Sequence, residues 1–296
     1  MKTVFVMLLL VVPLVSVCAD VAATVAQADA LHNQGAYADA VKLLLGAVST
    51  AAGGREQAEL YWRASRETME IGDVAARAGK PADSVLAIFT EGEGYADKAI
   101  AADPGNDLGY YWKSANIGRW GQVKGIVNSL FKAAPMKDLL VKELSLNPER
   151  TDAYYVLGEL YRELPAWPVS FGNVDAAVSF GRRAVDTRQQ QVKDGEEKEL
   201  VYNFYTELAK SLYKRNWSAA TRLAEQKNKA AKLASASSAV DKASFYEATV
   251  TLANQPDREE AKALVQWVVS QLTSAPSITA PEKKDLQKAQ DVLKGW

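Results

Sequence analysis

The amino-acid sequence predicts an all-α fold in which pairs of helices stack into a solenoid. Aromatic side chains followed by small ones recur at helical spacing in Tyr61–Ser65, Tyr110–Ala115 and Tyr154–Gly158. Asp103-Pro104 and Asn147-Pro148 each follow an apolar run, and proline disfavours a helical conformation in the residue before it. Strand signals are nearly absent, since no convincing period-two run stands between glycine-rich turns. These observations predict helices that are joined by turns and repeated along the chain.

The first residues are expected to be a leader rather than part of the fold. Lys2 gives a short positive start, Val4–Val12 is an unbroken apolar run, and Pro13 follows it. We expect cleavage between the small residue Ala19 and Asp20. The apolar run is too short to span a bilayer comfortably. Residues 1–19 are therefore predicted to be the signal peptide of a periplasmic or secreted protein.

A second interpretation of the leader rests on Cys18, the only cysteine of the chain. Leu14–Cys18 has the form of a bacterial lipobox, in which the cysteine is lipidated and anchors the protein to a membrane. Val17 is bulky for the position before that cysteine, which favours soluble export. Both interpretations give a mature fold without a disulfide, which a core of this size does not need.

Helix pairs continue along the chain when its small and large positions are aligned. The best copy begins near Thr151, where large, large, small and large side chains share one helical face. A small side chain there lets a neighbouring helix approach closely. The aligned positions are Ala40, Leu44 and Ala47 after the turn Gln34–Tyr37; Tyr154, Leu157, Gly158 and Tyr161; Ala177 and Ala184; and Ala220 and Ala224 after Asn216-Trp217.

This pattern resembles the tetratricopeptide (TPR) repeat, a helix-turn-helix unit of about 34 residues. The resemblance implies a right-handed α-solenoid over residues 20–255. The copies lie further apart than the standard unit, so we expect inserted segments at 71–83, 120–135 and 164–173. The stretch 154–184 is also similar to the repeats of the regulator-of-microtubule-dynamics family. The Tyr-Trp-x-x-Ala pattern at Tyr111 resembles the TPR partners of TRAP-type solute transporters.

Further helices are predicted after the repeats. Residues 196–214 are amphipathic at helical spacing, and the Ala- and Lys-rich residues 222–235 predict an exposed helix. Residues 257–272 and 281–296 predict two more. We expect residues 256–296 to cap the solenoid, whose last unit would otherwise expose a hydrophobic face.

Composition argues against several functions. The formal net charge of -1 offers no basic surface for nucleic acid. His32, the only histidine, is expected to cap a helix end or to face water. Gly92–Gly94 lacks the rest of a phosphate loop, so these glycines are expected to kink a helix or to mark a close helix contact. Carboxylates alternate with Lys and Arg, which predicts solvated faces. We therefore expect neither an enzyme, nor a metal site, nor a cofactor.

A partner-binding groove is expected on the concave side, where the first helix of each repeat lies. Aromatic and arginine side chains in such a groove are typical of interface hot spots. An error of one residue in register would move Trp62 or Trp112 into the core, and this alternative stays open. The resemblance implies these groove positions: Trp62, Arg66, Trp112, Asn116, Arg119, Tyr155, Glu159, Arg162 and Tyr205.

The inserted segment 164–173 is a second candidate site. Pro165 and Pro168 bracket Trp167 and stiffen the backbone, so fixing this loop over a partner costs less entropy. The alternative, which we favour slightly, is that Trp167 and Phe171 plug the core between displaced helices.

Three functions are compatible with this fold, which does not by itself determine function. The leading hypothesis is a non-catalytic scaffold of the bacterial cell envelope that binds a protein or peptide. The alternative is a ligand-binding accessory component of a TRAP-type transporter, and a pocket lined by Trp112, Trp120 and Trp167 would favour it. A structural subunit of an envelope machine is the third. The identity of the partner and the oligomeric state cannot be derived from the sequence.

Overall fold

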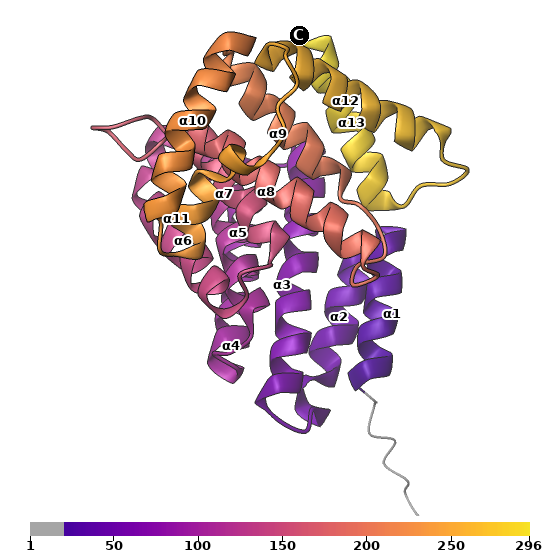
Figure 1. Ribbon diagram of the computed structural model, residues 1–296. Helices are drawn as coiled ribbons and strands as arrows, with labels where there is room; N and C mark the ends of the chain where they lie inside the picture. Colours follow the sequence, from indigo (N-terminus) through magenta and orange to yellow (C-terminus); the bar gives the residue numbers. More distant parts are fainter. Residues whose placement is uncertain (1–20) are drawn as a thin grey trace, which may run out of the picture.

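The computed structural model describes residues 21–296, and within them the chain is all-helical (Figure 1). The leader and Cys18 lie outside the described residues. The α-helices are α1 Val21–Gln34, α2 Tyr37–Ala47, α3 Gly54–Arg77, α4 Ala82–Ala102, α5 Asp107–Lys124, α6 Ile126–Leu146, α7 Thr151–Glu163, α8 Val174–Lys193, α9 Tyr202–Arg215, α10 Ala219–Ser235, α11 Ala239–Ser244, α12 Asp257–Ser274 and α13 Ala280–Lys294. Two 3₁₀ helices, η1 Val48–Thr50 and η2 Tyr246–Thr249, join them.

Consecutive helices pack side by side from α1 to α9, which is the arrangement of a helical solenoid. Turn chemistry explains the helix boundaries. Gly35 has a positive φ of 78° between α1 and α2, where the turn was predicted. Asp103 and Asn147 end α4 and α6 in extended conformation, each just before a proline. The predicted all-α solenoid is confirmed.

Small residues set the spacing of the helix pairs, as expected. Gly158 of α7 lies against the backbone of α8, since a Cβ added there would come within 3.3 Å of the Ala177 carbonyl oxygen. Leu157, Ala177 and Phe180 are fully buried around this contact. Each fully buried apolar side chain of Leu or Phe size contributes about 1.5–3 kcal/mol. The α7–α8 pair is thus held by a close helix contact inside the largest hydrophobic cluster.

Only one of the three inserted segments is a loop. Residues 71–83 mostly lengthen α3, and residues 120–135 lengthen α5 and α6, with Pro135 inside α6. Residues 164–173 do form a loop between α7 and α8, closed by hydrogen bonds from the Gly172 and Asn173 amides to the carbonyls of Pro165 and Tyr161. The extra length of the repeats is therefore mainly extra helix.

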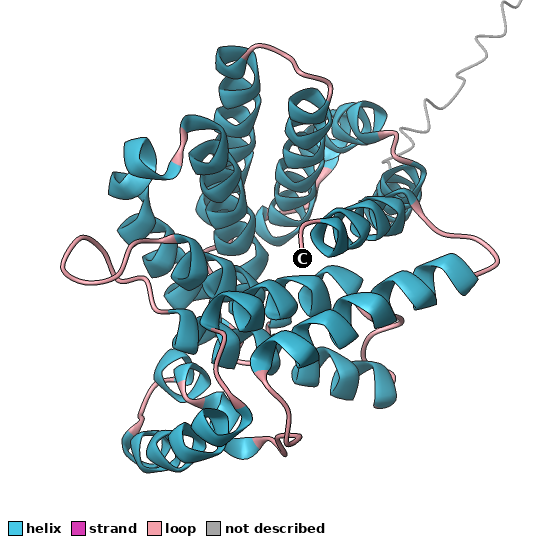
Figure 2. Cartoon of the chain, turned by 90° about the horizontal axis from the view of Figure 1, so that it is seen from above, coloured by secondary structure: helices cyan, strands magenta, loops and turns pink. Residues whose placement is uncertain are grey.

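The C-terminal helices return towards the N-terminal ones. Helix α12 packs on α9, and α13 packs on α12, α9 and α1. Figure 2, which looks down on the molecule, places the C-terminus near the middle of the view. The boundary of a separate cap at residue 256 stays a prediction. Within residues 21–296, no helix is long and apolar enough to cross a membrane.

Candidate functional site

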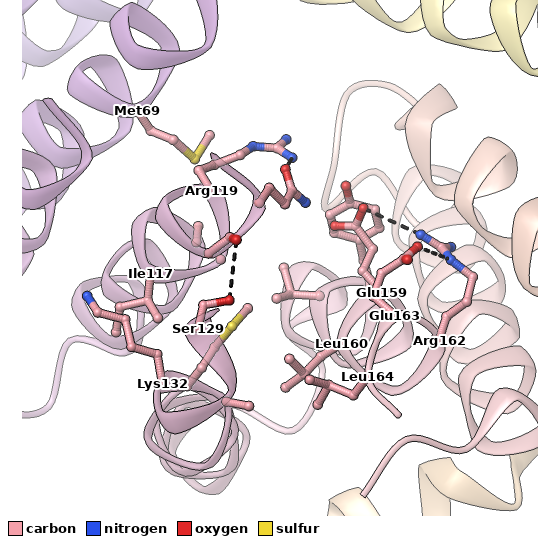
Figure 3. Close-up of a pocket in the computed structure, with 18 of the residues that line it drawn as sticks. Met69, Ile117, Arg119, Ser129, Lys132, Glu159, Leu160, Arg162, Glu163 and Leu164 are labelled. Carbon is pink, nitrogen blue, oxygen red and sulfur yellow. Dashed lines mark hydrogen bonds and ion pairs between the residues drawn. The ribbon is translucent and has the colours of Figure 1, made fainter. Parts of the chain in front are cut away.

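A cleft of about 460 Å³ opens on the concave side, between α5, α6 and α7. One wall carries Met69 and Arg119, and the facing wall carries Glu159, Leu160 and Leu164 (Figure 3). Apolar side chains dominate the lining, while the charged groups stand at its edge. They come from six helices and include Met69 of α3; Tyr111, Ile117 and Arg119 of α5; Lys132, Ala133 and Met136 of α6; Tyr155, Val156, Glu159, Leu160 and Arg162 of α7; Lys210 of α9; and Lys288 of α13.

Arg119 is fixed at the edge of the cleft by partners on both sides. Its Nε lies 3.3 Å from Asp73 Oδ1 of α3, and its Nη1 donates to Gln122 at 3.0 Å. Burial disfavours the charged form of Asp73, but the charges of Arg119 and Lys284 outweigh it and lower the pKa of this carboxyl. The guanidinium of Arg119 is therefore paired with an ionised Asp73 carboxylate. It can accept a partner's carboxylate only by sharing its donors.

Arg162 and Glu207 form a buried pair at the other end of the cleft. Arg162 is 3% exposed, and its Nη2 lies 2.5 Å from Glu207 Oε2 on α9. Lys210 and Lys288 also contact Glu207, at 3.1 and 2.5 Å. Burial would raise the pKa of Glu207, but Lys288, Arg162 and Lys210 lower it well below its usual range. This cluster joins α7, α9 and α13.

Two tyrosines give the cleft an uncharged polar lining. Tyr155 stacks on Phe204 with ring centroids 4.9 Å apart, and its hydroxyl accepts a hydrogen bond from Asn203 Nδ2 at 2.7 Å. Burial raises the pKa of both Tyr111 and Tyr155 well above the ordinary value. Both phenols therefore stay protonated and uncharged at neutral pH. A lining of uncharged side chains suits the apolar groups of a ligand.

The structure brings together four of the nine predicted groove residues. Arg119, Tyr155, Glu159 and Arg162 line the cleft. On α7 the predicted register is correct. Arg162 is nevertheless a buried, paired side chain rather than an exposed one.

The α3 and α5 positions of the predicted groove are mostly in the core. Trp62 is 6% exposed and shares a hydrophobic cluster with Trp112. Arg66 pairs with Asp29 and Glu67, both at 2.6 Å, outside the cleft. On α5 the cleft is lined by Arg119 as predicted, but by Tyr111 and Ala115 in place of Trp112 and Asn116. Trp62 is therefore buried, as the alternative of a register error has it, while Trp112 is partly buried against the same cluster.

Asn116 and Tyr205 are also buried, contrary to their predicted place in a groove. Asn116 is fully buried, and its Nδ2 donates to Ser65 Oγ at 3.0 Å, whose hydroxyl donates to the Gly92 carbonyl at 2.8 Å. Tyr205 is 4% exposed and packs against Trp267, with ring centroids 4.6 Å apart. Asn116 thus links α5 to α3 and α4 by hydrogen bonds. Tyr205 belongs to the core between α9 and α12.

The two aromatic residues of the loop at 164–173 lie in different environments. Trp167 is 86% exposed, so the expectation that it plugs the core is wrong. Phe171 packs on Tyr161, with centroids 5.3 Å apart, and Lys137 lies over its ring at 4.9 Å. Phe171 thus anchors the loop, while Trp167 and the exposed Val169 stand at its surface.

Several charged residues that were expected in solvent are buried in ion pairs. His32 Nδ1 lies 2.9 Å from Oε2 of Glu67, a fully buried carboxylate, so the histidine neither caps a helix nor stands free in water. In α10, the helix expected to be exposed, Arg222 and Lys229 are 1% and 3% exposed. Pairing explains this difference, because a buried charge is tolerated when a counter-ion accompanies it.

The buried cluster around α10 is the largest network of charges that sequence reasoning missed. Glu247 of η2 accepts hydrogen bonds from Arg182, Arg215 and Lys229 at 2.6–3.0 Å. Asp257 accepts from Arg215, at 2.8 Å for each oxygen. The network ties α8, α9, α10, η2 and α12 together. No cluster of His, Cys, Asp or Glu suited to a metal ion occurs within residues 21–296.

Comparison with known proteins matches part of the chain to a protein family. Residues 24–167 match the family described as Regulator of microtubule dynamics protein 1-3, a family of the helical-repeat type. No curated protein matches the chain. The similarity runs from α1 into the loop after α7, so it lies mostly upstream of the segment 154–184 on which the resemblance was first seen. It includes most residues of the cleft, but not Lys210 or Lys288.

Proposed function

We propose that this protein is a non-catalytic scaffold that binds a protein or peptide partner in the cleft between α5, α6 and α7. The observation that carries the proposal is the cleft itself, with an apolar lining and charged groups at its edge. Apolar side chains of a partner would enter the cleft, while Arg119 and Glu159 would orient its polar atoms. The helical-repeat family of the match supports a binding role.

We further propose that the helix pairs are TPR-like units and that residues 1–19 direct the chain to the bacterial cell envelope, periplasmic, secreted or lipid-anchored at Cys18. The Ala, Gly and aromatic positions of α7 and α8 support the first point. The charge and apolar pattern of the leader supports the second.

A small-molecule site in a TRAP-type transport system is the second candidate. The cleft volume favours it, because small-ligand sites typically measure about 300–1,000 Å³. The sequence predicted a tryptophan-lined pocket for that function, and Trp112, Trp120 and Trp167 do not line the cleft. This counts against the transporter function. A peptide partner is therefore the preferred occupant.

A pair of substitutions on α6 tests the proposal. Ala133 lines the cleft and is 6% exposed, whereas its neighbour Ala134 is exposed on the outer face. Ala133→Trp should fill the cleft and remove partners that the wild-type chain retains from an envelope extract. Ala134→Trp, the matched control, should retain them.

The same two variants distinguish a peptide partner from a small-molecule ligand. Native mass spectrometry of the purified chain would show a bound small molecule as an added mass that Ala133→Trp removes. Retention of the same proteins by both variants, with equal thermal midpoints, would contradict the proposal that the cleft binds the partner.

A further inference from the structure

Helix α13 crosses the concave side of the molecule from the N-terminal helices to α9. At its start, Ala280 Cβ lies close to the α1–α2 turn, 3.3 Å from where a Cβ on Gly35 would stand. At its end, Trp296 stacks on Tyr213 of α9, with centroids 4.1 Å apart and planes 2° from parallel. The helix is therefore a strap across the solenoid (Figures 1 and 2).

Two lysines one helical turn apart hold this strap to carboxylates of the concave face. Lys284 Nζ contacts Glu70 at 3.0 Å and Asp73 at 2.6 Å on α3, and Lys288 Nζ contacts Glu207 at 2.5 Å on α9. Within residues 21–296, Lys284 is the only ion-pair or hydrogen-bond partner that Glu70 has through its carboxylate. Lys288 also lines the cleft, so the strap borders the proposed binding site.

The apolar anchoring of α13 is slight for a helix of its length. Ala289 is its one fully buried residue, whereas α12 buries five residues. The connection between the two helices is exposed from Ala275 to Ser277, as is the end of α12 before it. Leu286, Val292, Leu293 and Trp296 are only half-buried against the core, so few fully buried apolar contacts add to the lysine–carboxylate pairs that hold this segment. Such an element beside an exposed connection can detach by local opening.

The helix also carries its own folding signals. Thr279 and Glu282 form a capping box, and Pro281 stands in the first turn. These local interactions do not depend on docking. The segment can therefore remain helical as it leaves, and another helix of similar chemistry can take its place.

We propose that α13 is an intramolecular ligand, and that the surface beneath it is a docking site for a partner's amphipathic helix with two lysines one turn apart. The three carboxylates on α3 and α9 select the lysines, and the half-buried contacts of Leu286 and Val292 show where the apolar face of the helix lies. This inference deepens the proposed function, on which it rests, by naming the kind of partner and the step that admits it.

A labelled peptide of residues 278–296, used with full-length chains, tests the proposal by fluorescence anisotropy. Lys284→Glu with Lys288→Glu should free the site, so this variant should bind the peptide at least tenfold more tightly than the wild-type chain does. Lys283→Glu with Lys294→Glu is the matched control. Both of these lysines are exposed and neither pairs with another helix, so this variant should bind like wild type.

Charge reversal and hydrogen exchange complete the test. A peptide with Lys284→Glu should bind poorly to the freed site, because its glutamate would face the carboxylates of Glu70 and Asp73. In the wild-type chain, amides of α13 should exchange at least tenfold faster than those of α8. Equal protection of α13 and α8, or a peptide that binds no variant, would overturn the proposal. Neither measurement uses an external partner, so a failure here leaves the test with Ala133→Trp intact.

Discussion

Gly92 of α4 lies directly against the side chain of Asn116 on α5. A Cβ added there would stand 2.2 Å from Asn116 Oδ1, whereas one added at Gly94 would meet nothing within 4 Å. Gly92→Ala should therefore lower the free energy of unfolding by about 1–3 kcal/mol through overpacking. Gly94→Ala, on the exposed side of the same helix, should raise it by about 0.5–1 kcal/mol. Urea unfolding of both variants checks this, and equal effects would contradict the close contact.

Glu143 is a fully buried carboxylic acid, and neither of its carboxyl oxygens has a hydrogen-bond partner within residues 21–296. Burial raises its pKa well above the ordinary value, and Asp152 acts in the same direction. The folded state thus keeps a proton that the unfolded chain releases above its ordinary pKa of 4.5, so stability falls as pH rises.

We expect Glu143→Gln to stabilise the fold at pH 8 by about 1–3 kcal/mol, because no buried carboxylate then has to stay protonated. The gain should shrink as pH falls towards 5. Asp138→Asn, an exposed change on the same helix, should alter stability little. Thermal midpoints across this pH range measure both, and a gain that is independent of pH would refute the assignment.

Residue roles were predictable where helical register sufficed. Tyr155, Glu159 and Arg162 reach the cleft as expected, because α7 follows the repeat closely. Trp62 and Asn116 do not, since a helix packed on both sides buries the positions that would face solvent in a simpler array. Pairing across helices, as for Glu67 with His32, leaves no local signal in the sequence.

Helix α10 is attached to the fold mainly by charge. Its only buried residues are Arg222 and Lys229, and Lys229 reaches Glu247 at 2.6 Å. Burial opposes the ionisation of Glu247, but its hydrogen bonds with Arg215 and the charges of Arg182 and Lys229 lower its pKa well below the usual range. The stabilisation is therefore present above the unfolded pKa of about 4.5 and is lost as pH falls through the lower, folded value.

Glu247→Gln should cost about 3–5 kcal/mol at pH 7, because it leaves buried cations without their counter-ion. Glu149→Gln is the control, since that side chain is 61% exposed in its pair with Arg183 and should cost less than about 1 kcal/mol. Chemical denaturation at pH 7 measures both. Similar small losses would mean that the network does not hold α10.

Docking of α13 should depend on pH through Asp285. Burial, with a smaller contribution from Glu70, raises the pKa of this carboxyl to about 6, although the charges of Lys288 and Lys284 and the hydrogen bond from the Asn203 amide oppose the rise. The folded value lies above the ordinary 3.8, so the contribution to docking is complete at low pH and is lost as pH rises through 6.

The stack of Trp296 on Tyr213 reports this change. The fluorescence difference between the wild-type chain and Trp296→Phe should show tighter docking at pH 5.5 than at pH 8. Asp285→Asn should remove most of that dependence. Asp73 and Glu207 keep their charges in this range because neighbouring cations lower their pKa despite burial. A fluorescence difference that shows tighter docking at pH 8 than at pH 5.5 would contradict this account.

At the level of elements, the sequence predicted helices far better than their surroundings. The boundaries of α12 and α13 fall within a few residues of prediction, because proline and capping residues act locally. The Ala- and Lys-rich composition of α10 predicted an exposed helix, and most of it is exposed. The burial of Arg222 depends on a carboxylate as distant in sequence as Asp257. The insertions at 71–83 and 120–135 are mainly helix, with breaks at Gly79 and Gly125, where φ is positive. Helix α6 continues through Pro135.

The whole molecule is a solenoid whose concave side is apolar in its cleft and charged where α13 crosses it. Three helices supply most of the cleft, and they lie within the segment that matches the helical-repeat family. The strap comes from outside that segment. Most of the cleft therefore lies within the matched segment, while α13, which borders the cleft, lies outside it.

Site-specific photo-crosslinking in the producing cell tests most directly whether the cleft binds the partner. A photoreactive amino acid would replace Ala133, which lines the cleft, or Ala134, which faces outwards on the same helix. The account predicts a discrete adduct from position 133 and none from position 134. Adducts from position 134 alone, or the same adducts from both positions, would contradict it.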